Sequence, residues 1–167
     1  MEGHTLITPR SRSVWKEIIE STGSQRVCEI GFNFGHSTRI LLELGCDVHS
    51  IDINPECHPR MVALGAEFPK FSYEIGVSTG LMKQCDLLFI DGDHSILGIQ
   101  KDMFVAGRLK PKAIVVDDWG GEWFVHIPVI VKNAITTMNR LKDYAITGVY
   151  TYDASDGDNK MGLLERK

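Results

Sequence analysis

The chain is 167 residues long and carries a formal net charge of −4, with 43% hydrophobic and 24% charged residues. This length predicts a single domain that buries a full core without disulfides, and the composition is that of an ordinary globular protein. The acidic excess argues against a nucleic-acid partner, whose groove would need clustered lysine and arginine. We expect one domain over 1–167, with an N-terminal helical segment at 1–25 and a core at 26–167.

Two further properties bear on the compartment of the protein. The longest apolar runs, such as Leu87–Ile90, have four residues, whereas spanning a bilayer takes about 20. Residues 1–15 lack the apolar stretch of a secretion signal, and the cysteines form no C-x-x-C pair, which favours reduced thiols over disulfides or zinc. The sequence therefore predicts a cytoplasmic protein with no membrane partner.

Short apolar runs alternate along the chain with longer amphipathic stretches. The first helix is expected to start at a Ser13 cap and to end at Gly23, and a proline-containing helix passes through Met61 and Leu64. Further helices are expected at 38–44, 95–109 and 127–141. The apolar runs predict strands at 26–30, 48–53, 71–75, 86–90, 113–116, 144–152 and 160–164.

The order of these elements predicts the fold class. Five strands separated by helices require crossovers between parallel neighbours, and helices must then cover both faces of the sheet. The last two strands have only the turn at 153–159 between them, so they must pair antiparallel. We expect an α/β, Rossmann-like, doubly wound and mostly parallel seven-stranded sheet with an antiparallel C-terminal hairpin.

A glycine-containing loop follows the first strand, where residues 29–37 read EIGFNFGHS. Ligands of open α/β sheets bind outside the carboxyl ends of the strands. Gly31 and Gly35 would let the backbone approach a ligand, and the next helix offers free N–H groups to an anion. The G-x-x-x-G spacing lacks the middle glycine of the dinucleotide pattern, and the phenylalanines would crowd a pyrophosphate. A carboxylate is the better occupant.

Acidic residues end the first two strands. Asp52 lies 21 residues beyond Gly31, where a carboxylate can accept hydrogen bonds from both hydroxyls of a ribose. Glu29 could pair with an ammonium group. A ligand with a carboxylate, an ammonium and a ribose describes S-adenosylmethionine. The alternative, in which the glycines only shape a turn and Asp52 is a solvated carboxylate, stays open.

On these residues the chain resembles the class I methyltransferases, whose first motif is E-x-G-x-x-x-G followed by an acidic residue at the end of strand two. The resemblance extends from about Val27 to the terminal hairpin, and this family has a seven-stranded sheet with an antiparallel last strand. It implies S-adenosylmethionine as cofactor. The cofactor contacts expected from the loop and the resemblance together are Glu29, Gly31, Asn33, Gly35, His36, Ser37, Asp52, Val77, Ser78 and Asp91. At Val77 and Ser78 a plain polar turn is the alternative.

Three aspartates follow strands four and five. Asp91 comes directly after the fourth strand, and Asp117 and Asp118 come after the fifth. If these strands are neighbours, the three carboxylates converge and raise each other's pKa. Mg²⁺ or another divalent cation would relieve that repulsion and keep positions open for substrate oxygens. Helix capping by Asp93 or Ser95 is an alternative that leaves the aspartate pair unexplained.

The segment FIDGDHS at 89–95, together with the aspartate pair, resembles the metal-dependent O-methyltransferases. It is most similar to the sugar O-methyltransferase branch related to macrocin methylation. The resemblance implies that Asp91, Asp117 and Asp118 bind the metal ion. His94 takes the position at which catechol-type relatives carry a lysine base, and an imidazole with a pKa of about 6.5 suits a general base. His94 and Asp91 are the expected catalytic residues.

The expected function is S-adenosylmethionine-dependent and Mg²⁺-dependent methylation of a hydroxyl group on a small molecule, with a sugar as one candidate acceptor and a homo-oligomer as one candidate assembly. Two other classes stay open. One is a cofactor-binding module that needs a partner chain for its acceptor site. The other is a different Rossmann-type enzyme, such as a nicotinamide reductase or a metal-assisted hydrolase, which the missing middle glycine and the terminal hairpin disfavour.

Overall fold

The computed structural model describes residues 5–80, 83–120, 124–154 and 157–167. The first four residues of the predicted N-terminal segment and positions 155–156 of the predicted hairpin turn lie outside them. The strands are β1 (Arg26–Ile30), β2 (Asp47–Asp52), β3 (Phe71–Ile75), β4 (Leu87–Ile90), β5 (Ala113–Val116), β6 (Tyr144–Ala154) and β7 (Gly157–Arg166). The helices are α1 (Pro9–Thr22), α2 (His36–Glu43), α3 (His58–Glu67), α4 (Ile96–Leu109) and α5 (His126–Thr137), with 3₁₀ turns η1 (Pro55–Cys57) and η2 (Ser78–Gly80).

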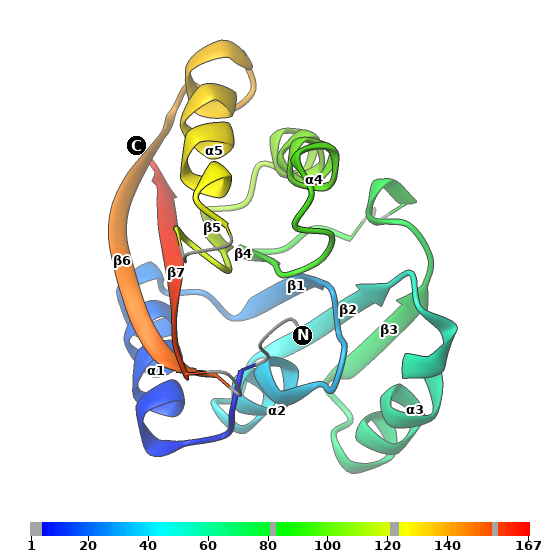
Figure 1. Cartoon of the computed structure of the whole chain (residues 1–167). Coiled ribbons are helices and arrows are strands. Elements are labelled where there is room, and N and C mark those ends of the chain that lie inside the picture. The colour runs from blue at the N-terminus through cyan, green and yellow to red at the C-terminus, as the bar shows by residue number, and fades with distance from the viewer. Residues whose placement is uncertain (1–4, 81–82, 121–123, 155–156) are drawn as a thin grey trace.

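The strands form one seven-stranded sheet in the order β3-β2-β1-β4-β5-β7-β6 (Figure 1). Strands β1 to β5 pair in parallel, whereas β7 runs antiparallel to both β5 and β6. This arrangement confirms the predicted fold class, including the antiparallel hairpin. β4 lies between β1 and β5, so the condition under which the three strand-end aspartates converge, that strands four and five are neighbours, is met.

Helices cover both faces of the sheet, each over its own apolar core (Figure 1). On one face α1, α2 and α3 bury Trp15, Leu41 and Met61 against the strands. On the other face α4 and α5 bury Met103 and Ile127. Parallel strands covered in this way are apolar on both sides, which explains why β4 and β5 read as continuous apolar runs.

The two hairpin strands are longer than predicted, and the first helix starts earlier. Its N-cap is Thr8, whose hydroxyl accepts a hydrogen bond from the backbone N–H of Ser11 at 3.1 Å, with Pro9 at the first helical position. A threonine cap followed by proline is a strong start signal, so the predicted Ser13 cap is wrong. The predicted Ser95 cap of α4 is confirmed, since its hydroxyl accepts from the N–H of Gly98 at 3.0 Å.

The backbone beyond β1, β4 and β5 stays hydrogen-bonded across the sheet. The N–H of Gly31 donates to Ile51, that of Asp91 to Ile30 and that of Asp117 to Ile90, all at 2.8–2.9 Å. The residues that follow these strands therefore lie at one edge of the sheet. Within the described ranges, no helix has both the length and the apolar character needed to cross a membrane.

Candidate active site

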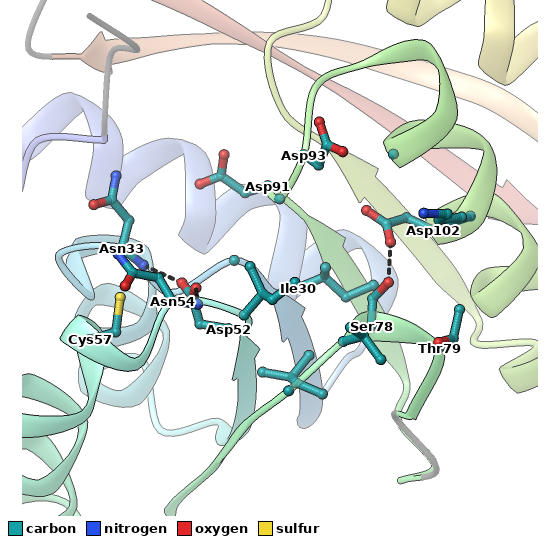
Figure 2. Close-up of a pocket in the computed structure, with 18 residues that line it drawn as sticks. Ile30, Asn33, Asp52, Asn54, Cys57, Ser78, Thr79, Asp91, Asp93 and Asp102 are labelled. Atoms are coloured by element: carbon teal, nitrogen blue, oxygen red, sulfur yellow. Dashed lines mark hydrogen bonds between the residues drawn. The ribbon is translucent and has the colours of Figure 1, made fainter.

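A cavity of about 490 Å³ opens at the carboxyl ends of β1, β2 and β4 (Figure 2). Its walls come from the segments that follow β1 to β4 and from the first turns of α4. A volume of this size is typical of small-molecule sites, and the place is the switch point of a doubly wound sheet, where the strand order reverses beside β1. Six of the predicted cofactor residues line it: Gly31, Asn33, Asp52, Val77, Ser78 and Asp91.

Gly31 is needed because two backbones meet at it. Its φ is +91°, and a Cβ atom built on it would lie 1.9 Å from the carbonyl oxygen of Asp91. Any side chain would push the loop away from the end of β4. Gly35, with a φ of +76°, does not line the cavity. A Cβ there would meet the ring of Phe32 at 2.5 Å, so Gly35 lets that ring enter the core rather than contacting a ligand.

Asp52 organises the loop from the end of β2. Its Oδ2 accepts hydrogen bonds from the backbone N–H groups of Phe32 at 2.7 Å and Asn33 at 3.0 Å, and its Oδ1 accepts from the N–H of Asn54 at 2.8 Å. An ionised carboxylate offers about four acceptor positions, so capacity remains toward the cavity that Asp52 lines.

Glu29 does not reach the cavity. Residues alternate sides along β1, so Ile30 lines the cavity while Glu29 points to the face covered by α2. Its carboxyl group is 1% exposed and accepts hydrogen bonds from the hydroxyls of Thr38 and Ser50. Burial raises the pKa of Glu29 to about 8, so it is neutral at pH 7. The structure contradicts the expected contact with a ligand ammonium.

His36 and Ser37 also face away from the cavity, toward the segment that precedes α1. The Nδ1 atom of His36 lies 2.7 Å from the carbonyl oxygen of Thr5, and the hydroxyl of Ser37 donates to the Thr5 hydroxyl at 3.2 Å. Thr5 in turn forms an antiparallel bridge with Ala154 of β6. These two residues hold the N-terminal segment on the hairpin, contrary to the expected cofactor contacts.

The predicted acidic cluster forms beside the cavity and is bridged by a histidine. His94 places Nδ1 2.8 Å from Oδ2 of Asp118 and Nε2 3.5 Å from Oδ1 of Asp91. The hydroxyl of Tyr152 lies 2.7 Å from both carboxylate oxygens of Asp117. The Asp91 side chain is 22% exposed and lines the cavity, whereas Asp117 and Asp118 are buried behind it.

The charges in this cluster act on one another strongly. Burial raises the pKa of Asp91, and burial together with the charges of Asp91 and Asp118 raises that of Asp117. Burial alone would lower the pKa of His94, but its contacts with Asp118 and Asp91 outweigh burial and raise it to about 11. His94 is therefore an imidazolium at neutral pH in this arrangement, which differs from the expected unprotonated base.

Three clustered carboxyl groups are the oxygen donors that Mg²⁺ prefers. However, the chain as described contains no group of three or more His, Cys, Asp or Glu side chains arranged to hold a metal ion. His94 lies between Asp91 and Asp118, and the Asn159 amide donates to Asp118. The three carboxyl groups have the chemistry to bind a divalent cation, but in this structure the positive charge beside them is that of His94.

Three residues of this region were not predicted from the sequence. Asp102 lines the cavity from α4. The sequence does point to it, because Asp102 follows Ile99 by three residues and so places a charged side chain on the apolar face of that helix. Tyr152 and Asn159 reach the acidic cluster from paired positions of β6 and β7. Nothing in the sequence signals those two, because strand pairing alone brings them to the cluster.

No family model matches the sequence, and no curated protein matches it either. Solved structures do match. An O-methyltransferase from Bacillus cereus in complex with S-adenosylhomocysteine superposes with a TM-score of 0.71 at 14% identity, over 98% of this chain and 83% of the other. TomG, a Streptomyces achromogenes O-methyltransferase in complex with S-adenosylmethionine, gives 0.68 at 15% identity, over 98% and 82%.

A third neighbour is the N-methyltransferase NodS of Bradyrhizobium japonicum, with a TM-score of 0.67 at 12% identity, over 96% of this chain and 99% of that one. These neighbours differ in the atom that they methylate. At such identities the likeness concerns the backbone, and it establishes that the chain has the class I methyltransferase fold.

Proposed function

We propose that this chain, which has the class I methyltransferase fold, transfers a methyl group from S-adenosylmethionine to a hydroxyl group of a small molecule. One observation carries the proposal. The cavity at the switch point of the sheet is lined by Asp52, which accepts hydrogen bonds from the backbone N–H groups of the glycine-containing loop. It is also lined by Asp91, the member of the acidic cluster that faces the cavity. A binding site for the donor and groups that handle protons thus share one cavity.

Residues from three loops would hold the donor. Asp52 has acceptor capacity left for ribose hydroxyls, and Gly31 and Asn33 border the cavity next to it. Val77 and Ser78 line it beyond the end of β3. When bound, S-adenosylmethionine supplies an electrophilic methyl group; the protein positions it and excludes water from the reacting atoms.

Methylation of a hydroxyl group requires that its proton leave. We assign this step to Asp91 and His94 together, because Asp91 faces the cavity and His94 contacts it. A carboxylate within reach of the hydroxyl accepts the proton, and the imidazolium beside it balances the charge of the carboxylate and keeps it oriented. Asp118 holds His94 in place through Nδ1, and Tyr152 holds Asp117.

We further propose that a divalent cation takes part in the reaction and that the acceptor is a sugar. The resemblance of the FIDGDHS segment to sugar O-methyltransferases supports both. Asp91, Asp117 and Asp118 would hold Mg²⁺, which would lower the pKa of a bound hydroxyl. Calorimetric titration of Mg²⁺ into the protein and into its Asp117→Asn variant tests the site. Unchanged methyl transfer in EDTA would reject the cation while leaving the methyltransferase proposal intact.

Calorimetry with S-adenosylmethionine and, separately, with NADH tests the donor assignment. Binding of the adenosyl ligand alone is the expected result, and selective binding of NADH would point to a Rossmann-type reductase instead. Methyl transfer from labelled donor to a panel of sugars and phenols then tests turnover. Donor binding without transfer to any acceptor, unless a partner chain is added, would favour the cofactor-binding module.

A further inference from the structure

Four polar side chains outside the cavity lie together on the sheet face that carries α4 and α5. On β2, His49 lies on the same side as Ile51, which packs under these helices, and it pairs with Ser72 of β3. Glu74 follows Ser72 on the same side of β3. β3 is an edge strand of the sheet (Figure 1), and the apolar core beneath α4 and α5 includes none of its described residues. His49 is 4% exposed and Ser72 is half-buried, whereas Glu74 and Lys83 are exposed, so solvent reaches the cluster from the side of β3.

The contacts of this cluster run in one direction. The ammonium group of Lys83 donates a hydrogen bond to Oγ of Ser72 at 2.9 Å, and this Oγ lies 2.9 Å from Nδ1 of His49. Nε2 of His49 lies 3.2 Å from Oε1 of Glu74. Because a carboxylate only accepts, Glu74 favours the tautomer with the proton on Nε2, and Nδ1 is then an acceptor. The Ser72 hydroxyl therefore donates to Nδ1, which is the arrangement of a serine nucleophile with its base.

The protonation state of His49 suits a base. Burial and the charge of Lys83 lower the pKa of His49, and they outweigh the opposite effect of Glu74. His49 is therefore neutral at neutral pH and can take up a proton. When it does so, Glu74 stabilises the imidazolium, and Lys83 provides positive charge for an oxyanion that forms at Ser72.

We propose that Ser72, His49 and Glu74 form a second reactive site, at which Ser72 takes up the acyl group of a short-chain ester. A small acyl group fits because the serine lies at an open sheet edge, where the leaving alcohol stays in solvent. None of these residues lines the donor cavity. The site is therefore separate from the proposed methyl transfer and does not depend on it.

The reaction has two steps. Oγ of Ser72 attacks the carbonyl carbon of the ester while the hydroxyl proton moves to Nδ1 of His49; the bond to the leaving oxygen then breaks, and that oxygen receives the proton. Water next attacks the acyl group on Ser72, with His49 again taking a proton, and the carboxylic acid leaves as the serine is restored. One ester and one water thus give one alcohol and one acid.

The compound p-nitrophenyl acetate is the probe, because its acyl group is small and its leaving group is coloured. With the full chain we expect release of p-nitrophenolate and, after rapid quenching in acid, an acetyl group that peptide mapping places on Ser72. Hydroxylamine should remove this acetyl group, since it is held as an ester. Acetylation of Lys83 instead, as a hydroxylamine-resistant amide, or no acetyl group on Ser72, would overturn the proposal.

Variants show whether the neighbours activate the serine. Ser72→Ala should remove the adduct, and Ser21→Ala is the matched control, because Ser21 is exposed but its hydroxyl donates to the carbonyl oxygen of Ile18 at 3.1 Å. His49→Gln should slow acetylation by about 10²-fold or more, as is typical when a general base is lost. Glu74→Gln changes an exposed side chain and should slow it several-fold.

Thermal melts check that each variant folds, and the exposed position of Glu74 keeps the test valid if His49→Gln does not. An acetylation rate equal to that of the wild type in Ser72→Ala, or in Glu74→Gln, would overturn the proposal. Calorimetric titration of S-adenosylmethionine into Ser72→Ala should give the wild-type affinity, because Ser72 lies outside the donor cavity. A large loss of donor affinity would show that Ser72 supports the fold of the cavity and would contradict a separate site.

Discussion

At the scale of single residues, the side of a strand on which a carboxyl group falls decides its role. Glu29 and Asp91 both lie at strand ends, in β1 and just beyond β4. The Glu29 side chain is enclosed by Thr38 and Ser50 and is neutral at pH 7, whereas Asp91 faces the cavity. The class I motif at residues 29–35 therefore contains one acid that packs the core between β1 and α2.

Glu29→Gln tests this reading through stability. Because the folded-state pKa of Glu29 is raised, the wild type loses stability as the pH rises from about 4.3, the unfolded value, toward about 8, at about 1.4 kcal/mol per pH unit. Glutamine cannot ionise and keeps an acceptor for both hydroxyls. In thermal melts we expect the variant to gain on the wild type steadily between pH 5 and pH 8, with donor affinity unchanged. Parallel pH profiles of the melting temperatures of wild type and variant, or a large loss of donor binding, would contradict the buried, neutral state of Glu29.

Asp117→Asn separates the acidic cluster from donor binding. Asp117 does not line the cavity, but it is held by Tyr152 and is linked to Asp91, whose charge raises the pKa of Asp117 and whose own pKa is lowered by a hydrogen bond with Asp117. We expect methyl transfer to fall by about 10²-fold or more, as is typical when acid–base groups are disturbed, while donor affinity changes less than threefold. Tyr152→Phe should lower turnover less. Wild-type turnover in Asp117→Asn would exclude the cluster from catalysis.

At the scale of elements, the antiparallel hairpin completes the site that the parallel strands begin. β7 lies beside β5 and passes close to Trp119, the residue after the aspartate pair. A Cβ atom built on Gly162 would lie 2.2 Å from the Trp119 ring. Because Gly162 has no side chain, β7 and Trp119 can pack against each other.

Gly162→Ala should therefore act on stability and activity together. Overpacking of this kind costs about 1–3 kcal/mol, and movement of Trp119 would shift the neighbouring Asp118. Chemical denaturation measures the first effect, and the methyl-transfer assay measures the second. Gly80→Ala is the control, because a Cβ there meets nothing within 4 Å. Equal stability of the two variants would show that the hairpin can move away at no cost.

At the scale of the whole molecule, one carboxylate ties the amino-terminal edge of the sheet together, opposite the cavity. Asp86 accepts hydrogen bonds from the backbone N–H groups of Gln25 and Arg26 and pairs with the side chains of Arg26 and Lys112. It thereby joins the starts of β1, β4 and β5. Burial alone would raise its pKa, but these hydrogen bonds outweigh burial and lower it to about 2.

The lowered pKa of Asp86 predicts that the protein loses stability in acid. A carboxylate with a depressed folded-state pKa stabilises the protein above its unfolded value, about 3.9, and this contribution is lost as the pH falls toward about 2. Asp86→Asn should be less stable at pH 7 and should lose less further stability below pH 4. Urea midpoints at pH 7, 4 and 3 measure the difference. The same midpoint shift at every pH would show that the charge of Asp86 is unimportant.

The sequence by itself determined the strands, the parallel pairing of the first five, the terminal hairpin and the strand-end positions of Asp52, Asp91 and the aspartate pair. These follow from local periodicity and from the rule that parallel strands end at one edge. Only the tertiary structure decided which acids face the cavity and that Tyr152 reaches the cluster. The orientation of Glu29 and the place of Asp102 depend on register and on contacts between segments far apart in the chain, and local sequence does not encode these.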